Sequence, residues 1–157
     1  MAIKKKHLTA GAVAAAAASL VAAWEGYYGN TYRDIVGVPT VCYGETEKAA
    51  VEAGRQRTFT KAECLSMLQQ SLKKYDDGFM ACVTRDIPDS VHIAGISFTY
   101  NVGIAGACRS SFVRHINRGD FREACDALLM WNRAGGRVVK GLDNRRKAER
   151  KVCLEGI

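Results

Sequence analysis

The sequence predicts an α+β fold with a small β-containing N-terminal lobe and a larger helical C-terminal lobe built around a buried central helix. Residues 26–58 are rich in Gly, Thr, Tyr and Val and contain few helical runs, a pattern typical of short hairpins. From residue 60 to the end, helical periodicity dominates. Strands followed by a run of helices, in a chain of one domain's length, indicate the α+β class.

The helical lobe begins with a clear start signal. Thr60-x-x-Glu63 is a capping box, in which two side chains satisfy the free backbone N–H groups at a helix N-terminus. Apolar residues at helical spacing then predict one long amphipathic helix: Leu65, Leu68, Leu72, Tyr75 and Phe79. Residues 91–102 are apolar on every side, so we expect them to form the buried central helix.

Three shorter helices are expected after the central one, each bounded by a capping residue and a glycine. Glycine suits a helix end because it adopts the left-handed backbone conformation without steric cost. The expected limits are Ser110 to Gly119, Asp120 (with Glu123 in a second capping box) to Gly135-Gly136, and Asp143 to Gly156.

The chain is basic, with 23 Lys and Arg against 16 Asp and Glu, a net charge of +7 (23 − 16). Such a surface attracts nucleic acid, anionic lipid or the anionic bacterial cell wall, although a solvated basic surface without a specific partner gives the same count. Aromatic and basic residues do not alternate in a stripe, so we do not expect nucleic-acid binding. No cofactor or metal is expected, because no glycine-rich phosphate loop occurs and the histidines lack ligand spacing: His7, His92 and His115.

The N-terminus has the layout of an export signal. Lys4, Lys5 and Lys6 precede an uncharged stretch at residues 8–23, whose 16 residues are short for a membrane span of about 20. A cleaved signal peptide, an uncleaved weak anchor and an ordinary soluble helix all fit this stretch. We favour export without removal, because cleavage after Ala23 would leave the acid at position 25 two residues from a frayed end.

Domain limits follow from this interpretation. We expect residues 1–23 to be a basic flank plus weak anchor and residues 24–157 to be a catalytic domain. Within that domain, residues 24–59 would form the β-containing lobe and residues 60–157 the helical lobe.

Two carboxylates are candidates for chemistry. Glu25 lies where a helical segment gives way to a Gly/Tyr-rich stretch, and Asp34 lies in the expected first hairpin. Glycoside hydrolysis needs such a pair, one carboxyl protonated to donate to the leaving oxygen and the other ionised. Spacing alone is weak support, because two acids nine residues apart are usually surface charges.

Several ordered motifs strengthen this interpretation. Glu25-x₈-Asp34-x₅-Thr40 resembles the catalytic pattern of the phage-type lysozymes, the endolysin muramidases, and the similarity covers about residues 24–154. Residues 32–44 look like that family's Y-x-D-x-x-G-x-x-T block, and residues 98–103 like its buried F-x-x-N-x-G helix. Residues 131–149 look like its W-x-x-A-G-G…G-L-x-x-R-R-x-x-E block.

The resemblance implies a lysozyme-like fold and specific roles. Glu25 would protonate the glycosidic oxygen, Asp34 would act on the opposite side of the sugar as base or stabiliser, and Thr40 would position the attacking water. Arg145 would hold Glu25 by a charge pair, although a solvent-facing cation is an equal alternative. Two further residues are candidates for contact with the glycan or for packing roles: Tyr43 and Asn101. Glu45 departs from the family, since many relatives carry histidine there.

The N-terminal stretch also resembles the anchor of the signal-anchor-release endolysins. Such proteins are exported tethered to the inner membrane, are inactive there, and become active when released into the periplasm. No cysteine precedes Cys42, so control by an anchor thiol is not expected. We hypothesise topological control: while residues 8–23 lie in lipid, Glu25 stays at the bilayer surface and cannot join the cleft. A monomer is expected.

Six cysteines spread along the chain indicate up to three disulfides in an oxidising compartment. We hypothesise Cys125–Cys153 across the last two long helices, with Cys42–Cys64 and Cys82–Cys108 as further pairs. Six cysteines allow 15 connectivities, so the sequence leaves the others open.

The predicted function is therefore a peptidoglycan muramidase that cleaves the β-1,4 bond between N-acetylmuramic acid and N-acetylglucosamine and lyses the host cell. A lytic transglycosylase would need Glu25 but no water-directing Asp34. A non-catalytic wall-binding protein would use the basic surface alone. Inversion or retention depends on the separation of the two carboxylates, which the sequence does not give.

Overall fold

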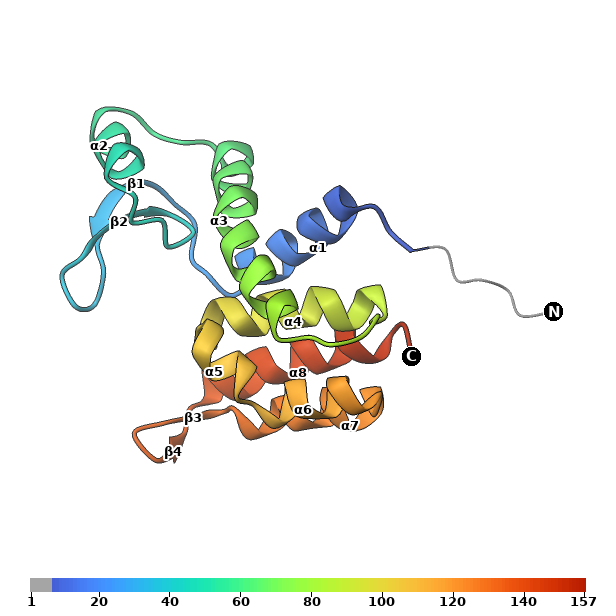
Figure 1. Ribbon diagram of the computed structural model, residues 1–157. Helices are drawn as coiled ribbons and strands as arrows, with labels where there is room; N and C mark the ends of the chain where they lie inside the picture. Colours follow the sequence, from blue (N-terminus) through green and yellow to red (C-terminus); the bar gives the residue numbers. More distant parts are fainter. Residues whose placement is uncertain (1–6) are drawn as a thin grey trace.

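The computed structural model describes residues 7–157 (Figure 1), so the basic flank Lys4–Lys6 lies outside the described residues. The longer helices are α1 (Ala10–Ala22), α2 (Lys48–Gln56), α3 (Lys61–Ala81), α4 (Asp89–Val102) and α8 (Lys140–Leu154). The shorter ones are α5 (Ile104–Cys108), α6 (Ser111–Arg118), α7 (Phe121–Ala127) and the 3-10 turn η1 (Leu128–Met130). Two small hairpins complete the fold: β1 (Tyr28–Arg33) with β2 (Pro39–Cys42), and β3 (Arg133–Ala134) with β4 (Arg137–Val138).

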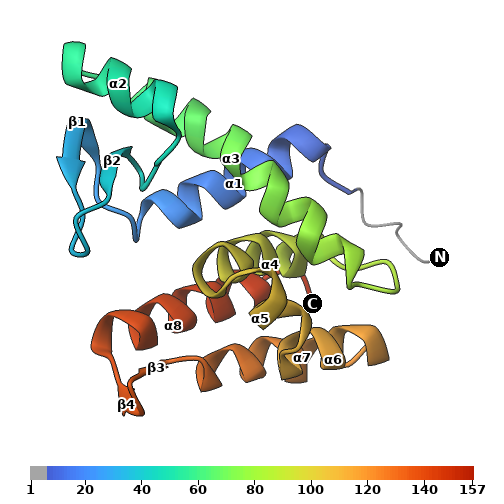
Figure 2. The ribbon, with the colours of Figure 1, turned by 60° about the vertical axis from the view of Figure 1, so that its left-hand side comes forward.

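Two lobes are visible in the ribbon views. Hairpin β1–β2 and helix α2 form a small lobe at one end, while α4 to α8 form the larger helical lobe (Figures 1 and 2). The long helix α3 runs from one lobe to the other. The α+β class predicted from the sequence is confirmed, with the β-structure confined to small antiparallel sheets.

The first hairpin is antiparallel, with Tyr32 opposite Thr40 and Arg33 opposite Pro39. Gly37 occupies the connecting turn with φ +84°, a conformation that other residues rarely adopt. The Gly37 N–H donates to the Asp34 carbonyl, and the Asp34 N–H donates to the Val38 carbonyl, so the turn is closed on both sides. This short loop fixes the position of the Asp34 side chain.

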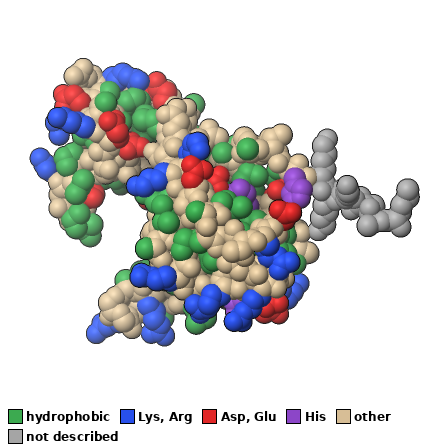
Figure 3. All heavy atoms as spheres, in the orientation of Figure 1, with side chains coloured by type: hydrophobic (Ala, Val, Ile, Leu, Met, Phe, Trp, Pro, Cys, Tyr) green, Lys and Arg blue, Asp and Glu red, His purple; other side chains and the backbone are tan. Residues whose placement is uncertain are grey.

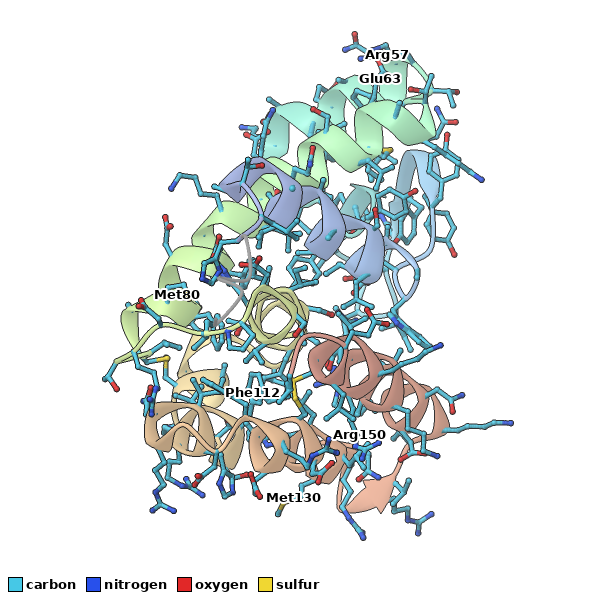
Figure 4. All side chains as sticks on the ribbon, turned by 90° about the vertical axis from the view of Figure 1, so that its right-hand side faces the viewer. Arg57, Glu63, Met80, Phe112, Met130 and Arg150 are labelled. Atoms are coloured by element: carbon cyan, nitrogen blue, oxygen red, sulfur yellow. A yellow bond between two sulfur atoms is a disulfide. The ribbon has the colours of Figure 1, made fainter. Side chains whose placement is uncertain are left out.

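Helix α4 is buried between two hydrophobic cores, as its all-round apolar sequence predicts. Ile93 and Ile96 pack into the first core, which α1, α3 and the β-lobe share. Val91, Ala94 and Phe98 pack into the second core, which α6, α7 and α8 enclose. Figure 4 shows the labelled Phe112 of α6 inside this second core, where its ring meets Phe98 edge to face at 5.4 Å. A helix with neighbours on both sides needs apolar residues on both faces.

The apolar N-terminal stretch forms α1 and contributes to the first core. Thr9 caps the helix by accepting from the Ala12 N–H, and α1 lies against α3 and α4. Its inward residues are fully or nearly fully buried: Val13, Ala17, Ala18 and Val21. Among the helices formed by residues 7–157, none combines the length and apolar character that a membrane crossing requires.

The beginning of this segment is held by Asp89 at the N-terminus of α4. Asp89 Oδ2 accepts from the Leu8 N–H at 2.7 Å, and Oδ1 lies 3.1 Å from His7 Nδ1. The bond from the Leu8 N–H, followed by that from His7, lowers the pKa of Asp89. Ionised Asp89 therefore ties the start of α1 to the helical lobe.

Replacing Asp89 with Asn is expected to lower the midpoint of thermal unfolding at neutral pH by about 2–4 °C, since about one hydrogen bond is weakened in a domain of this size. A carboxyl whose pKa is lower when folded stabilises the protein above its unfolded value, about 3.9, and loses that contribution as pH falls through the folded value. Wild type and variant should therefore converge in acid, and a constant difference from pH 7 to pH 2 would contradict this.

Helix α2 was not expected from the sequence. Residues 26–58 were predicted to form hairpins with few helical runs, and this was wrong for Lys48–Gln56. Glu47 caps α2 by accepting from the Ala50 N–H, and Val51 and Gly54 turn toward β1 and β2. Gly54 must be small, because a Cβ there would lie 2.6 Å from Thr31 Oγ1. Close packing against the first hairpin, more than helix propensity, therefore explains why residues 48–56 form a helix.

The ends of the last helices also differ from the prediction. The expected capping box at Asp120 and Glu123 is wrong, because the Asp120 side chain makes no capping hydrogen bond. The helix after it ends at Ala127 and continues as η1, while Gly135-Gly136 form the tip of hairpin β3–β4. Asp143 is not the cap of α8 but lies in its first turn, where it accepts from Asn132 and pairs with Lys147. By contrast, α3 with its capping box and α6 with its left-handed Gly119 end are confirmed.

Three disulfides join the cysteines in the pairs expected from the sequence: Cys42–Cys64, Cys82–Cys108 and Cys125–Cys153. The first links β2 to α3, and the last links α7 to α8. Each closes a loop of between 22 and 28 residues. Cross-links of this span stabilise a domain mainly by restricting its unfolded chain.

Candidate active site

Glu25 lies just beyond α1, where the chain crosses to the first hairpin (Figure 1). The Trp24 and Glu25 N–H groups both donate to the Val21 carbonyl, which extends the helix end by one turn. The Glu25 side chain is 29% exposed, and Arg145 Nη1 lies 3.0 Å from its Oε1. The carboxyl is thus open to solvent on one side and paired with a guanidinium on the other.

Asp34 and Thr40 lie on the hairpin that follows. Asp34 Oδ1 accepts from the Val36 and Val38 N–H groups at 3.0 and 2.8 Å, so the turn backbone holds this carboxylate. Thr40 on β2 is buried, and its hydroxyl donates to the Val38 carbonyl at 2.9 Å. All three candidate catalytic residues are therefore held by backbone or ionic contacts within one stretch of 16 residues.

The charge of Glu25 acts on two tyrosines, and the charge of Asp34 acts on one of them. Partial burial raises the pKa of Tyr32, and the charges of Tyr28, Asp34 and Glu25 add to the rise. Burial also raises the pKa of Tyr100, with a further contribution from Glu25. The charges of both candidate carboxylates therefore act on Tyr32.

The surface is hollowed at this side of the molecule. Figure 3 shows an indentation between the lobe that carries hairpin β1–β2 and the end of the helical lobe that carries β3–β4. Basic side chains lie on both sides of the indentation in this view.

Of the other predicted site residues, Tyr43 is buried in the first core, with its ring 6.1 Å from that of Tyr27. Its carbonyl accepts from the Tyr100 hydroxyl, so its visible role is packing. Asn101 is exposed, and its Oδ1 accepts from Arg146 Nη2 at 2.8 Å. Asn101 therefore remains available to a ligand through its amide nitrogen.

Glu45 lies in the loop after β2. One of its oxygens accepts from the Thr46 and Glu47 N–H groups, and the other accepts from the Ser71 hydroxyl at 2.6 Å. The Glu45 carboxylate is thus held by its own loop and by α3. Beside it lies a pocket of about 300 Å³ lined by Gly44, Glu45, Thr46, Gln70, Ser71, Lys74, Tyr75 and Tyr100.

Sequence reasoning missed a buried charge cluster behind Glu25. The Arg146 and Glu149 side chains have no exposed surface, and the Arg145 side chain is only 6% exposed. Their burial comes from the fold, because positions 145, 146 and 149 fall on the core side of α8, where charged residues are rare. Within residues 7–157, no three His, Cys, Asp or Glu side chains lie close enough together to hold a metal ion.

The chain is similar to known phage lysozymes and endolysins. Residues 22–149 match the sequence profile of the family described as Phage lysozyme. A SAR-endolysin of Bacteriophage PS119 is 42% identical over 132 residues, 84% of this chain and 77% of that protein. A SAR-endolysin of Pseudomonas phage phiKMV is 40% identical over 96% of this chain and 92% of its own length.

A solved structure shows the same fold. The endolysin from Escherichia coli O157:H7 phage FAHEc1 superposes with a TM-score of 0.77 at 24% identity, covering 89% of this chain and 91% of that one. The family profile spans both candidate carboxylates, the hairpin between them and the charge cluster of α8. The chain therefore belongs to the phage lysozyme family and is a muramidase endolysin, a glycoside hydrolase.

Proposed function

We propose that this enzyme cleaves the β-1,4 bond between N-acetylmuramic acid and N-acetylglucosamine in peptidoglycan with Glu25 as the general acid. Glu25 gives its proton to the glycosidic oxygen as the bond breaks. Asp34 acts from the opposite side of the sugar, as base or stabiliser, and Thr40 positions the water that completes hydrolysis. The observation that carries the proposal is the Glu25 carboxyl, partly open to solvent and held by Arg145 at the junction of the lobes.

The surroundings of the two carboxyl groups support different roles. Glu25 lies at a helix end near neutral tyrosines and one cation. Asp34 lies in an exposed turn, where its carboxylate accepts two backbone N–H bonds. Two carboxyl groups in unlike environments are what an acid and an ionised partner require.

Product analysis tests the reaction. Purified peptidoglycan digested by the wild type should yield reducing N-acetylmuramic ends in step with bond cleavage. Anhydro ends would instead identify a lytic transglycosylase, which does not use water. Binding without new ends of either kind would identify a non-catalytic wall-binding protein.

We further propose that the chain is exported and tethered to the inner membrane through residues 8–23 before it acts in the periplasm. Relatives carrying the name SAR-endolysin over most of the chain support this stage. The Ala-rich stretch of residues 8–23 is uncharged and follows three lysines. Its packing against α3 and α4 then represents the released form, in which the protein works as a monomer on glycan strands.

A further inference from the structure

The buried cluster behind Glu25 is a chain of alternating charge. Arg145 contacts Glu25 through Nη1 at 3.0 Å and donates through Nε to Glu149 Oε1 at 3.3 Å. Arg146 Nε lies 2.9 Å from the other oxygen of Glu149. One guanidinium is therefore shared by the proposed general acid and by a carboxylate in the protein interior.

Glu149 is surrounded by donors. The Ser97 hydroxyl donates to it at 2.7 Å, and both arginines contact its oxygens. Burial raises the pKa of Glu149, while the two guanidinium groups and the Ser97 hydroxyl oppose that rise. Every polar group in contact with the Glu149 carboxyl is a hydrogen-bond donor, and such donors favour its ionised form.

The charges behind Glu25 therefore sum to +1, from two arginines and one carboxylate. Without Glu149 the sum would be +2 in a region of low dielectric. A guanidinium next to a carboxyl lowers the pKa of that carboxyl by about 1–3 units. An unbalanced pair of arginines would thus leave a general acid ionised at the pH where it must carry a proton.

We propose that Glu149 is a positioning residue for the known reaction: it holds Arg145 against Glu25 and offsets its charge, so that Glu25 keeps the proton it donates. The inference rests on the proposed role of Glu25. Arg145 is thereby fixed from two sides, since its Nη2 also donates to the Ser97 carbonyl of α4 at 3.4 Å. Glu149 itself lies in the interior and contacts no substrate.

The other titratable groups near Glu25 do not offset the charge of the two arginines as Glu149 does. Burial raises the pKa of Tyr100 and of Tyr32, so both stay neutral in the working range of a lysozyme. The remaining acidic and phenolic neighbours act on Tyr100 from other elements: Tyr75 of α3 and Glu45 of the loop after β2. Among residues 7–157, the cation in ionic contact with Glu25 is Arg145 of the α8 cluster.

Three variants test the proposal through charge. Glu149→Gln keeps the shape of the side chain but raises the summed charge of residues 145, 146 and 149 to +2. The pKa of Glu25 should therefore fall by about one unit. Arg146→Met lowers the sum to zero and should raise the pKa of Glu25 by a similar amount. The double variant restores +1 and should return the pKa toward the wild-type value.

The pKa of Glu25 is measured by NMR titration of ¹³C-labelled glutamate carboxyl groups, with Glu25→Gln identifying the signal. In parallel, the alkaline limb of the pH profile of kcat/KM on soluble peptidoglycan fragments should move with it, because the acid must be protonated to react. A purely structural role predicts lower stability and lower rates at an unchanged pKa in both single variants, and that result would overturn the proposal.

Two further outcomes are distinguishable. If Glu149→Gln does not fold, the upward shift in Arg146→Met and its reversal in the double variant still decide the matter. If Glu25→Gln remains fully active, the general-acid role fails, whereas the NMR titration still reports whether Glu149 controls Glu25. A shift of the NMR pKa without any movement of the alkaline limb would also contradict the proposal.

Discussion

Replacing Glu25 with Gln is expected to slow the clearing of outer-membrane-permeabilised cells by about 10²–10⁴-fold, the contribution typical of a positioned general acid. Glutamine has the shape of glutamate and can still accept from Arg145 Nη1, so the contact at 3.0 Å can persist. It has no acidic proton to give to the glycosidic oxygen. The loss should therefore appear in kcat, with little change in the midpoint of thermal unfolding.

Glu52→Gln is the matched control for this experiment. Glu52 lies on α2, its side chain is 58% exposed, and its only recorded partner in the described part of the chain is Arg55. We expect Glu52→Gln to clear cells at the wild-type rate.

Like Glu25→Gln, Asp34→Asn is expected to lose most activity. Asn can still accept the two turn N–H bonds, but it carries no charge. Wild-type clearing by Glu25→Gln would end the case for this residue as the acid.

Exchanging residues 8–23 for a long, strongly apolar segment that is not cleaved is expected to abolish lysis of the host cell completely. Such a segment stays in the bilayer, so the first core loses the buried side of α1. Glu25, two residues beyond Ala23, is then held at the membrane surface and cannot reach Arg145. The measurement is culture turbidity after induction, with export checked by protease access from the periplasm.

The control for this experiment adds the same apolar segment ahead of residue 1 through a flexible linker and leaves residues 8–23 intact. This chain is also tethered, but α1 remains free to pack against α3 and α4. It should therefore lyse cells, whereas the exchanged chain should not. Equal lysis by both chains would show that the position of Glu25 does not depend on this segment.

Much of the fold could be predicted because its elements carry local signals. The Thr60 capping box, the glycine at 119 and the all-round apolar residues 91–102 each produced the element they indicate. Helix α2 could not be predicted in this way, since its apolar face is short and Gly54 is a poor helix former. Its position depends on contacts with the hairpin that are distant in sequence.

Part of the site could also be predicted from a local signal. The motif containing Glu25, Asp34 and Thr40 is contiguous, so one stretch of sequence contains all three. The pairing of Glu25 with Arg145 spans 120 residues and was expected only from family resemblance. The role of Glu149 could not be read from its spacing, because a charged residue four positions after Arg145 on a helix is normally a surface ion pair.

The alanines of α1 have a consequence for how quickly the host cell can be killed. Ala18 is buried where α1 meets its neighbours, and a larger side chain would not fit there without displacing those neighbours. The same small side chains make the stretch only weakly apolar, and departure from a bilayer becomes slower as each methylene is added. In the proposed tethered-then-released pathway, Ala18→Leu would therefore slow both release from the bilayer and packing of α1 into the first core, and lysis time in an induced culture should lengthen more than folding stability alone predicts. In that pathway the moment of lysis and the packing of the first core thus depend on the same few methyl groups.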